Sequence, residues 1–216
     1  MVKIIRNVLE EKYAEHLNSS IYNTSFDWWF HAYKYGSENP FYTRNPLKDS
    51  LKINDISLDM EKNFAKGNFV YRFSRSKAHI KTCTCYECEF NNYLNSDFLD
   101  LVKDTTDLQN PYIHESFISV YNRGDFLATH TDKDRGCAFV FNLTKNWRPQ
   151  FGGLLNVIHT ENKIETVFPE FNSLVLLDVS GKNGTPHFVS EISRMAPFPR
   201  VAISGWCRDT ETVDDE

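Results

Sequence analysis

The sequence predicts a mainly β fold, in which N-terminal helices pack against a β-barrel or double-sheet jelly-roll core. Eight short apolar runs lie between residues 113 and 207, separated by turn-forming stretches, and this pattern is typical of all-β barrels and jelly rolls. Earlier in the chain, helical apolar spacing is more frequent. We therefore expect a single domain over 1–216. Its helical and aromatic part spans 1–110, its β core 111–208 and its acidic tail 209–216.

The first half contains three predicted helices and one predicted strand. Residues 3–22 repeat apolar side chains about every 3.6 positions, which predicts an amphipathic helix. A second helix is predicted over 55–67 and a strand over 68–76. A third helix is predicted over 96–108, with Ser96 as its N-cap.

The aromatic stretch at 26–36, FDWWFHAYKYG, has six aromatic residues among eleven. One interpretation is a lid over a substrate site, because lids exclude water from closed sites. We favour the other interpretation, in which these rings pack between a helix and the sheet.

The second half is divided into short strands by Gly-, Pro- and Asn-rich turns. The predicted strands cover residues 113–121, 126–130, 136–143, 152–158, 163–168, 172–179, 187–192 and 200–207. No internal repeat interrupts this pattern. The succession of strands predicts the β core of the protein.

Composition excludes several classes of protein. The chain has 24 Lys and Arg against 29 Asp and Glu, a net charge of −5, so it lacks the basic surplus of nucleic-acid-binding proteins. Mean hydropathy is −0.48, and no apolar run approaches the roughly 20 residues that a membrane helix needs. The N-terminus has no signal-peptide core. We predict a cytoplasmic protein that binds neither nucleic acid nor membrane.

Three residues form a candidate metal site. His130 and Asp132 are two apart at the end of a predicted strand, and residues i and i+2 of a strand point to the same face. His187 opens a later strand and is the favoured third ligand. Two imidazoles and one carboxylate suit non-haem Fe(II). Because a His-x-Asp pair alone is common, two polar residues on a strand face are the alternative.

An arginine near the C-terminus is a candidate anion ligand. Arg200 begins the last predicted strand, and its guanidinium can bind a carboxylate through two parallel hydrogen bonds. Ser204 is four residues on and faces the same side. Arg194 is a competing anion ligand. A surface ion pair is the alternative for Arg200.

Residues 113–208 resemble the Fe(II)/2-oxoglutarate-dependent dioxygenases, in particular the prolyl 4-hydroxylase-like branch. The resemblance rests on SVYNRGDFLATHTD, FVFNLTKNWRPQFGGLLNV, NSLVLLDV, TPHFVSEI and PRVAISGW. It implies a double-stranded β-helix core. It also implies Fe(II) and the co-substrate 2-oxoglutarate, and it leaves ascorbate open as a further cofactor.

The resemblance implies roles for particular residues. His130, Asp132 and His187 would hold Fe(II) and act as the catalytic centre. Arg200 and Ser204 would bind the distal carboxylate of 2-oxoglutarate. The residues Tyr121 and Asn142 would complete the co-substrate site, and Trp206 is expected to pack in the core.

The implied reaction consumes O2 and 2-oxoglutarate and hydroxylates an unactivated C–H bond, with release of succinate and CO2. The target would be an amino-acid side chain, prolyl by family resemblance, in a protein or a small molecule. Two other functions stay open. One is a non-catalytic β-barrel that binds a peptide or small acid. The other is a zinc-dependent hydrolase, for which Glu115 and Asp125 are the candidate bases.

A cysteine cluster offers a second metal site. The stretch HIKTCTCYEC contains His79, Cys83, Cys85 and Cys88, residue types that suit zinc. Its C-x-C step is shorter than the usual spacing of zinc ligands, and thiols in a loop are the default interpretation. Five cysteines without an export signal argue against a disulfide framework.

A zinc site at this cluster has a direct test. Elemental analysis of the purified protein should find zinc, and the Cys85→Ser variant should lose it because one ligand is removed. Protein that is zinc-free and fully stable would eliminate the site.

Overall fold

The computed structural model describes residues 2–25, 29–37, 39–76, 85–94, 97–132, 135–160, 163–179 and 184–210. The strands are β1 (Val2–Arg6), β2 (Phe30–Tyr35), β3 (Phe41–Thr43), β4 (Val70–Arg75), β5 (Pro111–Tyr121), β6 (Phe126–His130), β7 (Cys137–Asn142), β8 (Leu155–Thr160), β9 (Lys163–Val167), β10 (Ser173–Asp178), β11 (His187–Val189) and β12 (Arg200–Asp209). The helices are α1 (Glu11–Tyr22), α2 (Ser50–Ala65), α3 (Tyr86–Leu94) and α4 (Asp97–Thr105), with a 3-10 turn η2 (Pro149–Phe151).

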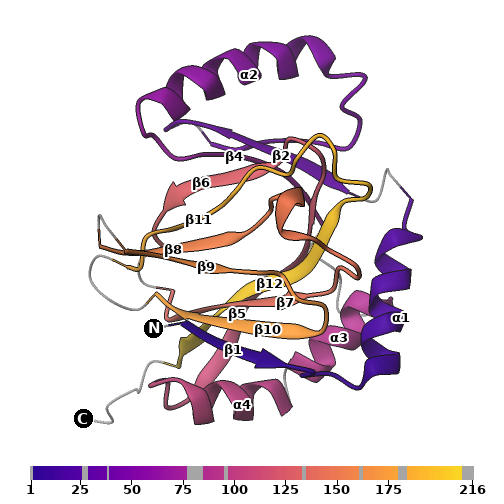
Figure 1. Cartoon of the computed structure of the whole chain (residues 1–216), viewed down its shortest axis with the longest axis vertical. Helices are drawn as coiled ribbons and strands as arrows, with labels where there is room; N and C mark the ends of the chain where they lie inside the picture. The colour runs from indigo at the N-terminus through magenta and orange to yellow at the C-terminus, as the bar shows by residue number, and fades with distance from the viewer. Residues whose placement is uncertain are drawn as a thin grey trace.

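The described strands form one antiparallel sheet that curls back on itself (Figure 1). Its order is β1-β10-β7-β12-β5-β4-β6-β11-β8-β9, with β2 and β3 extending from β4. Consecutive strands are frequently not neighbours, as expected for a jelly roll. The curl encloses a space between its two halves.

The β core agrees with the sequence prediction. Each of the eight predicted runs overlaps a strand, and the run at 126–130 matches β6 residue for residue. The predicted strand at 68–76 contains β4, and the predicted helices at 55–67 and 96–108 overlap α2 and α4. Ser96 lies outside the described residues.

The predicted helix at 3–22 was wrong over its first turns. Val2–Arg6 is strand β1, which pairs with β10 so that Ile4 faces Val175, and α1 begins at Glu11. Asn7 has a φ of 53°, which breaks any helix at that point. The first 110 residues therefore contribute strands β1–β4 as well as helices.

Apolar side chains alternate between two clusters on opposite faces of the sheet. Helices α1, α3 and α4 cover one face around Phe139, Phe141 and Ile203. The other face encloses a second cluster, to which Val175 and Leu177 contribute. This alternation follows from the two-residue period of a strand.

The aromatic stretch at 26–36 packs in apolar clusters where it is described. Trp29 is buried with α1 and α3, and Tyr33 on β2 packs against Ile56 and Met60 of α2. The packing interpretation is therefore confirmed from residue 29 onward, and residues 26–28 lie outside the described part. Helix α2 lies over this region, at the opposite end of the molecule from α4 (Figure 1). No described helix is both long and apolar enough to cross a membrane.

Phe141 should be a major contributor to stability. It is fully buried, with ring centroids 5.0 Å from Phe90 and 5.3 Å from Phe98. Phe141→Ala should lower the free energy of unfolding by about 3–5 kcal/mol, because it leaves a cavity between helices and sheet. Urea denaturation measures this change. Ile164→Ala, at a side chain that is 53% exposed, should change it by less than about 0.5 kcal/mol. A similar loss in both variants would contradict the assignment.

Candidate active site

Strands β6 and β11 bring the two predicted histidine ligands together. His130 ends β6, His187 begins β11, and the two residues are paired across the strands. Asp132 lies just beyond the end of β6, so the two-residue period of the strand does not itself place its side chain. Its carboxylate nevertheless lies beside the histidines, and one potential ligand atom from each of the three residues lies within 4.8 Å of the others.

Both imidazoles are held in the tautomer that a metal ion needs. Nδ1 of His130 lies 3.0 Å from the carbonyl oxygen of Ala128, and Nδ1 of His187 lies 2.8 Å from that of Thr185. A carbonyl accepts, so each Nδ1–H donates and each Nε2 keeps its lone pair. The Nε2 atoms are each 3.6 Å from an Asp132 oxygen. The donor set therefore fits a divalent cation.

His130 is kept neutral by its surroundings. Burial, reinforced by the neighbouring His187, lowers the pKa of His130 to about 4. Phe69 stacks on the His130 ring at 4.6 Å between centroids and 19° between planes. The imidazole is thus both oriented and unprotonated at neutral pH.

Trp206 orients the carboxylate of Asp132, a predicted metal ligand. Its indole Nε1–H donates to Oδ2 of Asp132 at 2.8 Å. We expected this tryptophan to pack in the core. It also lines the cavity that contains His130, Asp132 and His187. We call these three residues the metal-ligand group, because they are the predicted ligands. The sequence carried no signal for this hydrogen bond, because the two residues are 74 positions apart.

His130, Asp132 and His187 line a cavity of about 660 Å³. Aromatic side chains from several strands form much of its wall, among them Tyr42, Phe69, Tyr71, Phe73, Phe117, Tyr121 and Trp206. Arg200 and Ser204 of β12 line the same cavity. A volume in this range suits a small organic ligand.

Arg200 is a buried cation with unused hydrogen-bond donors. It is 3% exposed, and its Nη2 donates to Oδ1 of Asn142 at 3.0 Å. Its Nε has no hydrogen-bond partner among the described residues, which also provide no carboxylate within 4.0 Å of the guanidinium. Burial lowers the pKa of Arg200 from its ordinary value. A buried guanidinium with open donors fits a carboxylate ligand.

Of the other predicted co-substrate residues, two line the cavity and one accepts a hydrogen bond from Arg200. Tyr121 and Ser204 line the cavity, and the Tyr121 ring lies 5.4 Å from the guanidinium carbon. Asn142 is not among the lining residues and instead holds Arg200 in place. Arg194 lines a separate groove of about 770 Å³ between α2 and strands β6 and β11. Arg200 is therefore the better placed anion ligand.

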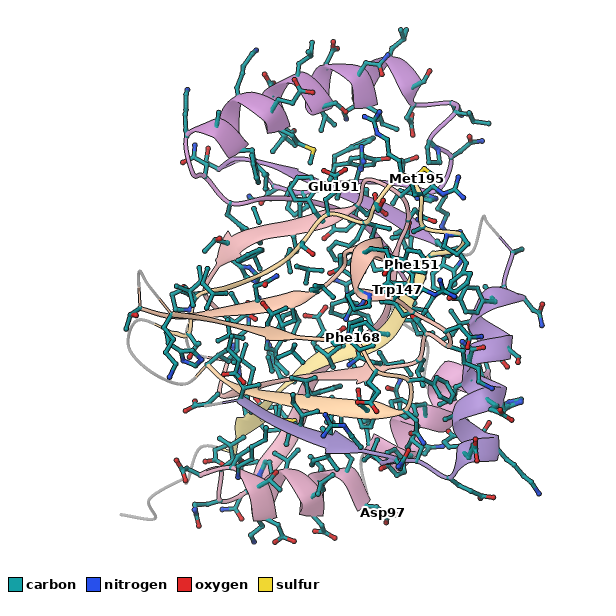
Figure 2. The ribbon with its side chains drawn as sticks, in the orientation of Figure 1. Asp97, Trp147, Phe151, Phe168, Glu191 and Met195 are labelled. Atoms are coloured by element: carbon teal, nitrogen blue, oxygen red, sulfur yellow. The ribbon has the colours of Figure 1, made fainter. Side chains whose placement is uncertain are left out.

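The groove under α2 adjoins the cavity without containing the ligands. Glu191 lines it, on the side of the barrel that faces α2 (Figure 2). Leu127 and Val189 line both spaces, so they form a shared wall.

Both candidate bases of the hydrolase alternative accept a hydrogen bond from an arginine. Glu115 lines the cavity, where Arg75 donates to it at 2.7 Å. Asp125 is buried, its pKa is raised to about 6 by burial, and it accepts a hydrogen bond from Arg72 at 2.9 Å. It does not line the cavity.

The cysteine cluster is described in part. Cys85 and Cys88 lie at the beginning of α3. His79 and Cys83 lie outside the described residues, so the zinc site stays a prediction.

Comparison with known proteins matches part of the chain to a family. Residues 116–208 match the model of the 2OG-Fe(II) oxygenase superfamily. These residues belong to that superfamily. The matched segment contains His130, Asp132, His187 and Arg200, and this superfamily implies iron and 2-oxoglutarate.

Solved structures confirm the double-stranded β-helix fold of the 2OG-Fe(II) oxygenases. A Pseudomonas putida prolyl-4-hydroxylase has a TM-score of 0.58 at 14% identity, over 97% of this chain and 92% of that one. A Trichoplax adhaerens prolyl hydroxylase, solved with a hypoxia inducible factor peptide fragment, has a TM-score of 0.60 at 16% identity, over 96% and 83% of the two chains. A Burkholderia pseudomallei 2OG-Fe(II) oxygenase family protein has a TM-score of 0.61 at 9% identity, over 95% and 84%.

A curated relative is an uncharacterized lipoprotein of Rickettsia typhi. It is 28% identical over 116 residues, which are 53% of this chain and 9% of the lipoprotein. The chain thus matches less than a tenth of that protein's length.

Trp206→Phe should weaken metal binding by about tenfold, because it removes the indole donor to Asp132 and keeps the ring. Anaerobic Fe(II) titration measures the affinity. Trp147→Phe is the matched control. Trp147 packs beside Phe151 (Figure 2), and its Nε1–H donates to the carbonyl of Gly152, outside the metal-ligand group. Equal weakening in both variants, or none in Trp206→Phe, would contradict this role.

Proposed function

We propose that the protein is an Fe(II)- and 2-oxoglutarate-dependent dioxygenase that hydroxylates an amino-acid side chain, prolyl by family resemblance. One observation carries the proposal. The metal-ligand group and a buried arginine with open donors line the same cavity. A metal-binding group alone suits many reactions, but this combination suits a keto-acid co-substrate with a second carboxylate.

His130, Asp132 and His187 would hold the iron. When bound, Fe(II) supplies activation of O2, which couples decarboxylation of 2-oxoglutarate to succinate and CO2 with hydroxylation of the substrate C–H. The protein fixes the three donors by the carbonyls of Ala128 and Thr185 and by the indole of Trp206. Such support reduces the reorganisation needed on metal binding.

Arg200 would bind the distal carboxylate of 2-oxoglutarate, with Ser204 and Tyr121 beside it. The Nε of Arg200 lacks an acceptor in the described residues, and a carboxylate would provide one. Burial raises the pKa of Tyr121 to about 12, so its hydroxyl stays a donor at neutral pH. Asn142 would act by orienting Arg200 rather than by touching the co-substrate.

The aromatic wall of the cavity supports an amino-acid side chain as the target. Tyr42, Phe69 and Tyr71 give flat apolar surfaces near the ligands, and aromatic-lined grooves favour proline-containing segments. The peptide bound to the Trichoplax adhaerens relative is consistent with a protein substrate. The ion pair of Glu115 with Arg75 argues against the hydrolase, because a hydrolase needs an available general base.

The first test is anaerobic addition of Fe(II) and 2-oxoglutarate to metal-free protein. We expect the visible charge-transfer band of an iron-chelated keto acid, and we expect His187→Ala to abolish it because a ligand is lost. Iron binding without the band would overturn the 2-oxoglutarate assignment.

The same titration separates the co-substrate ligand from the metal ligands. In Arg200→Gln, 2-oxoglutarate affinity should fall about 10- to 100-fold, as expected for a lost charged hydrogen bond of about 1.5–3 kcal/mol, while Fe(II) affinity changes little. Arg194→Gln, in the groove under α2, is the matched control and should behave as wild type. Unchanged 2-oxoglutarate affinity in Arg200→Gln would contradict the role of Arg200.

A further inference from the structure

Two arginines other than Arg200 lie in the candidate active-site cavity, each stacked on an aromatic ring. The guanidinium carbon of Arg75 is 3.9 Å from the centroid of Phe117, and that of Arg135 is 4.1 Å from the centroid of Trp206. The Phe117 and Trp206 centroids are 5.8 Å apart. The four side chains thus form a continuous row of contacts, Arg75–Phe117–Trp206–Arg135, in which the two rings are tilted by 45°. We call this row the arginine–aromatic stack.

Strand pairing fixes the two rings of the stack. Phe117 on β5 is paired with Ser204 on β12, and Trp206 is paired with Glu115. Cation–π attraction stabilises each guanidinium carbon over its ring. The N–H groups in the guanidinium plane then stay available for a carboxylate.

The two arginines differ in how far their charge is satisfied. Arg75 donates to Glu115 at 2.7 Å. The side chain of Arg135 makes no hydrogen bond or ion pair with any residue that the structure describes. Of the two positive charges in the stack, one is therefore paired with Glu115, and the other carboxylate that lines the cavity, Asp132, belongs to the predicted metal site.

The two arginines of the stack are more exposed to solvent than Arg200. Arg200 is 3% exposed, whereas Arg75 and Arg135 are both partly exposed. Trp206 contacts Arg135 with its ring face and donates to Asp132 with its ring N–H. A carboxylate held by Arg135 would thus be one side chain away from the metal-ligand group.

We propose that Arg135, assisted by Arg75, binds a carboxylate of the substrate, so that the enzyme selects an acidic peptide segment around its target residue. This rests on the proposed function, because it takes the cavity as the substrate site. The carboxylates of the co-substrate and of the substrate would then bind to different arginines. The co-substrate carboxylate goes to the buried Arg200, and the substrate carboxylate goes to the partly exposed stack.

A peptide library tests the selectivity directly. The probe is a pentapeptide library with a random central residue, in which each flanking position carries Asp or Glu, Asn or Gln, or Lys or Arg. It is applied to protein loaded anaerobically with Fe(II) and 2-oxoglutarate, and retained peptides are quantified. We expect acidic members to be enriched about fivefold over amide members, the scale of a partly exposed ion pair of about 1 kcal/mol.

Three variants assign the effect to Arg135. Arg135→Gln should lose the acidic enrichment, and Arg135→Glu should invert it in favour of Lys or Arg. Arg44→Gln is the matched control, because Arg44 also stacks on a ring, Phe30 at 4.7 Å, but does not line the cavity. It should keep the wild-type enrichment.

The outcomes separate the two proposals. No acidic enrichment in the wild type, retained enrichment in Arg135→Gln, or no inversion in Arg135→Glu would overturn substrate selection by Arg135. The charge-transfer band of the same loaded samples tests the proposed function independently. It also shows that each variant has kept its folded iron site.

Discussion

The antiparallel pairing of β6 with β11 is the constraint on which the site depends. It sets His130 directly opposite His187, so the spacing of two ligands is fixed by backbone hydrogen bonds rather than by flexible side chains. Asp132 follows the end of β6 and accepts a hydrogen bond from Trp206. Because β11 also pairs with β8, and β6 with β4, neither ligand strand can shift without breaking ladders on both sides.

Strand β12 shows how one sheet serves stability and chemistry together. Val201 and Ile203 face the cluster under the helices, while Arg200, Ser204 and Trp206 face the cavity. The alternation allows a buried cation to be placed one residue away from a fully apolar core. A register error of one residue would put Arg200 among the phenylalanines, at a prohibitive cost in desolvation.

Local patterns predicted most of the β core and the three side chains that the structure brings together as a candidate metal site. Turn residues and two-residue alternation are short-range signals, so the run at 126–130 could be placed exactly as a strand, and His130, Asp132 and His187 followed from residue type and order. The hydrogen bond from Trp206 to Asp132 and the stacking of Arg135 could not be predicted, because they depend on which strands pair. The hydrogen bond between Asn142 and Arg200 could not be predicted for the same reason, because the two residues are 58 positions apart.

The N-terminal strand has a consequence for solubility. Leu174–Leu177 of β10 are all buried, and without β1 this apolar strand would be an open sheet edge able to pair with another molecule. Strand β1 covers it and becomes the new edge, carrying Lys3, whose ammonium donates to the carbonyl of Thr105, and Arg6, which is paired with Glu170. Charged side chains on a short edge strand discourage further strand addition. Strand β1 thus protects the apolar β10 from pairing with another molecule.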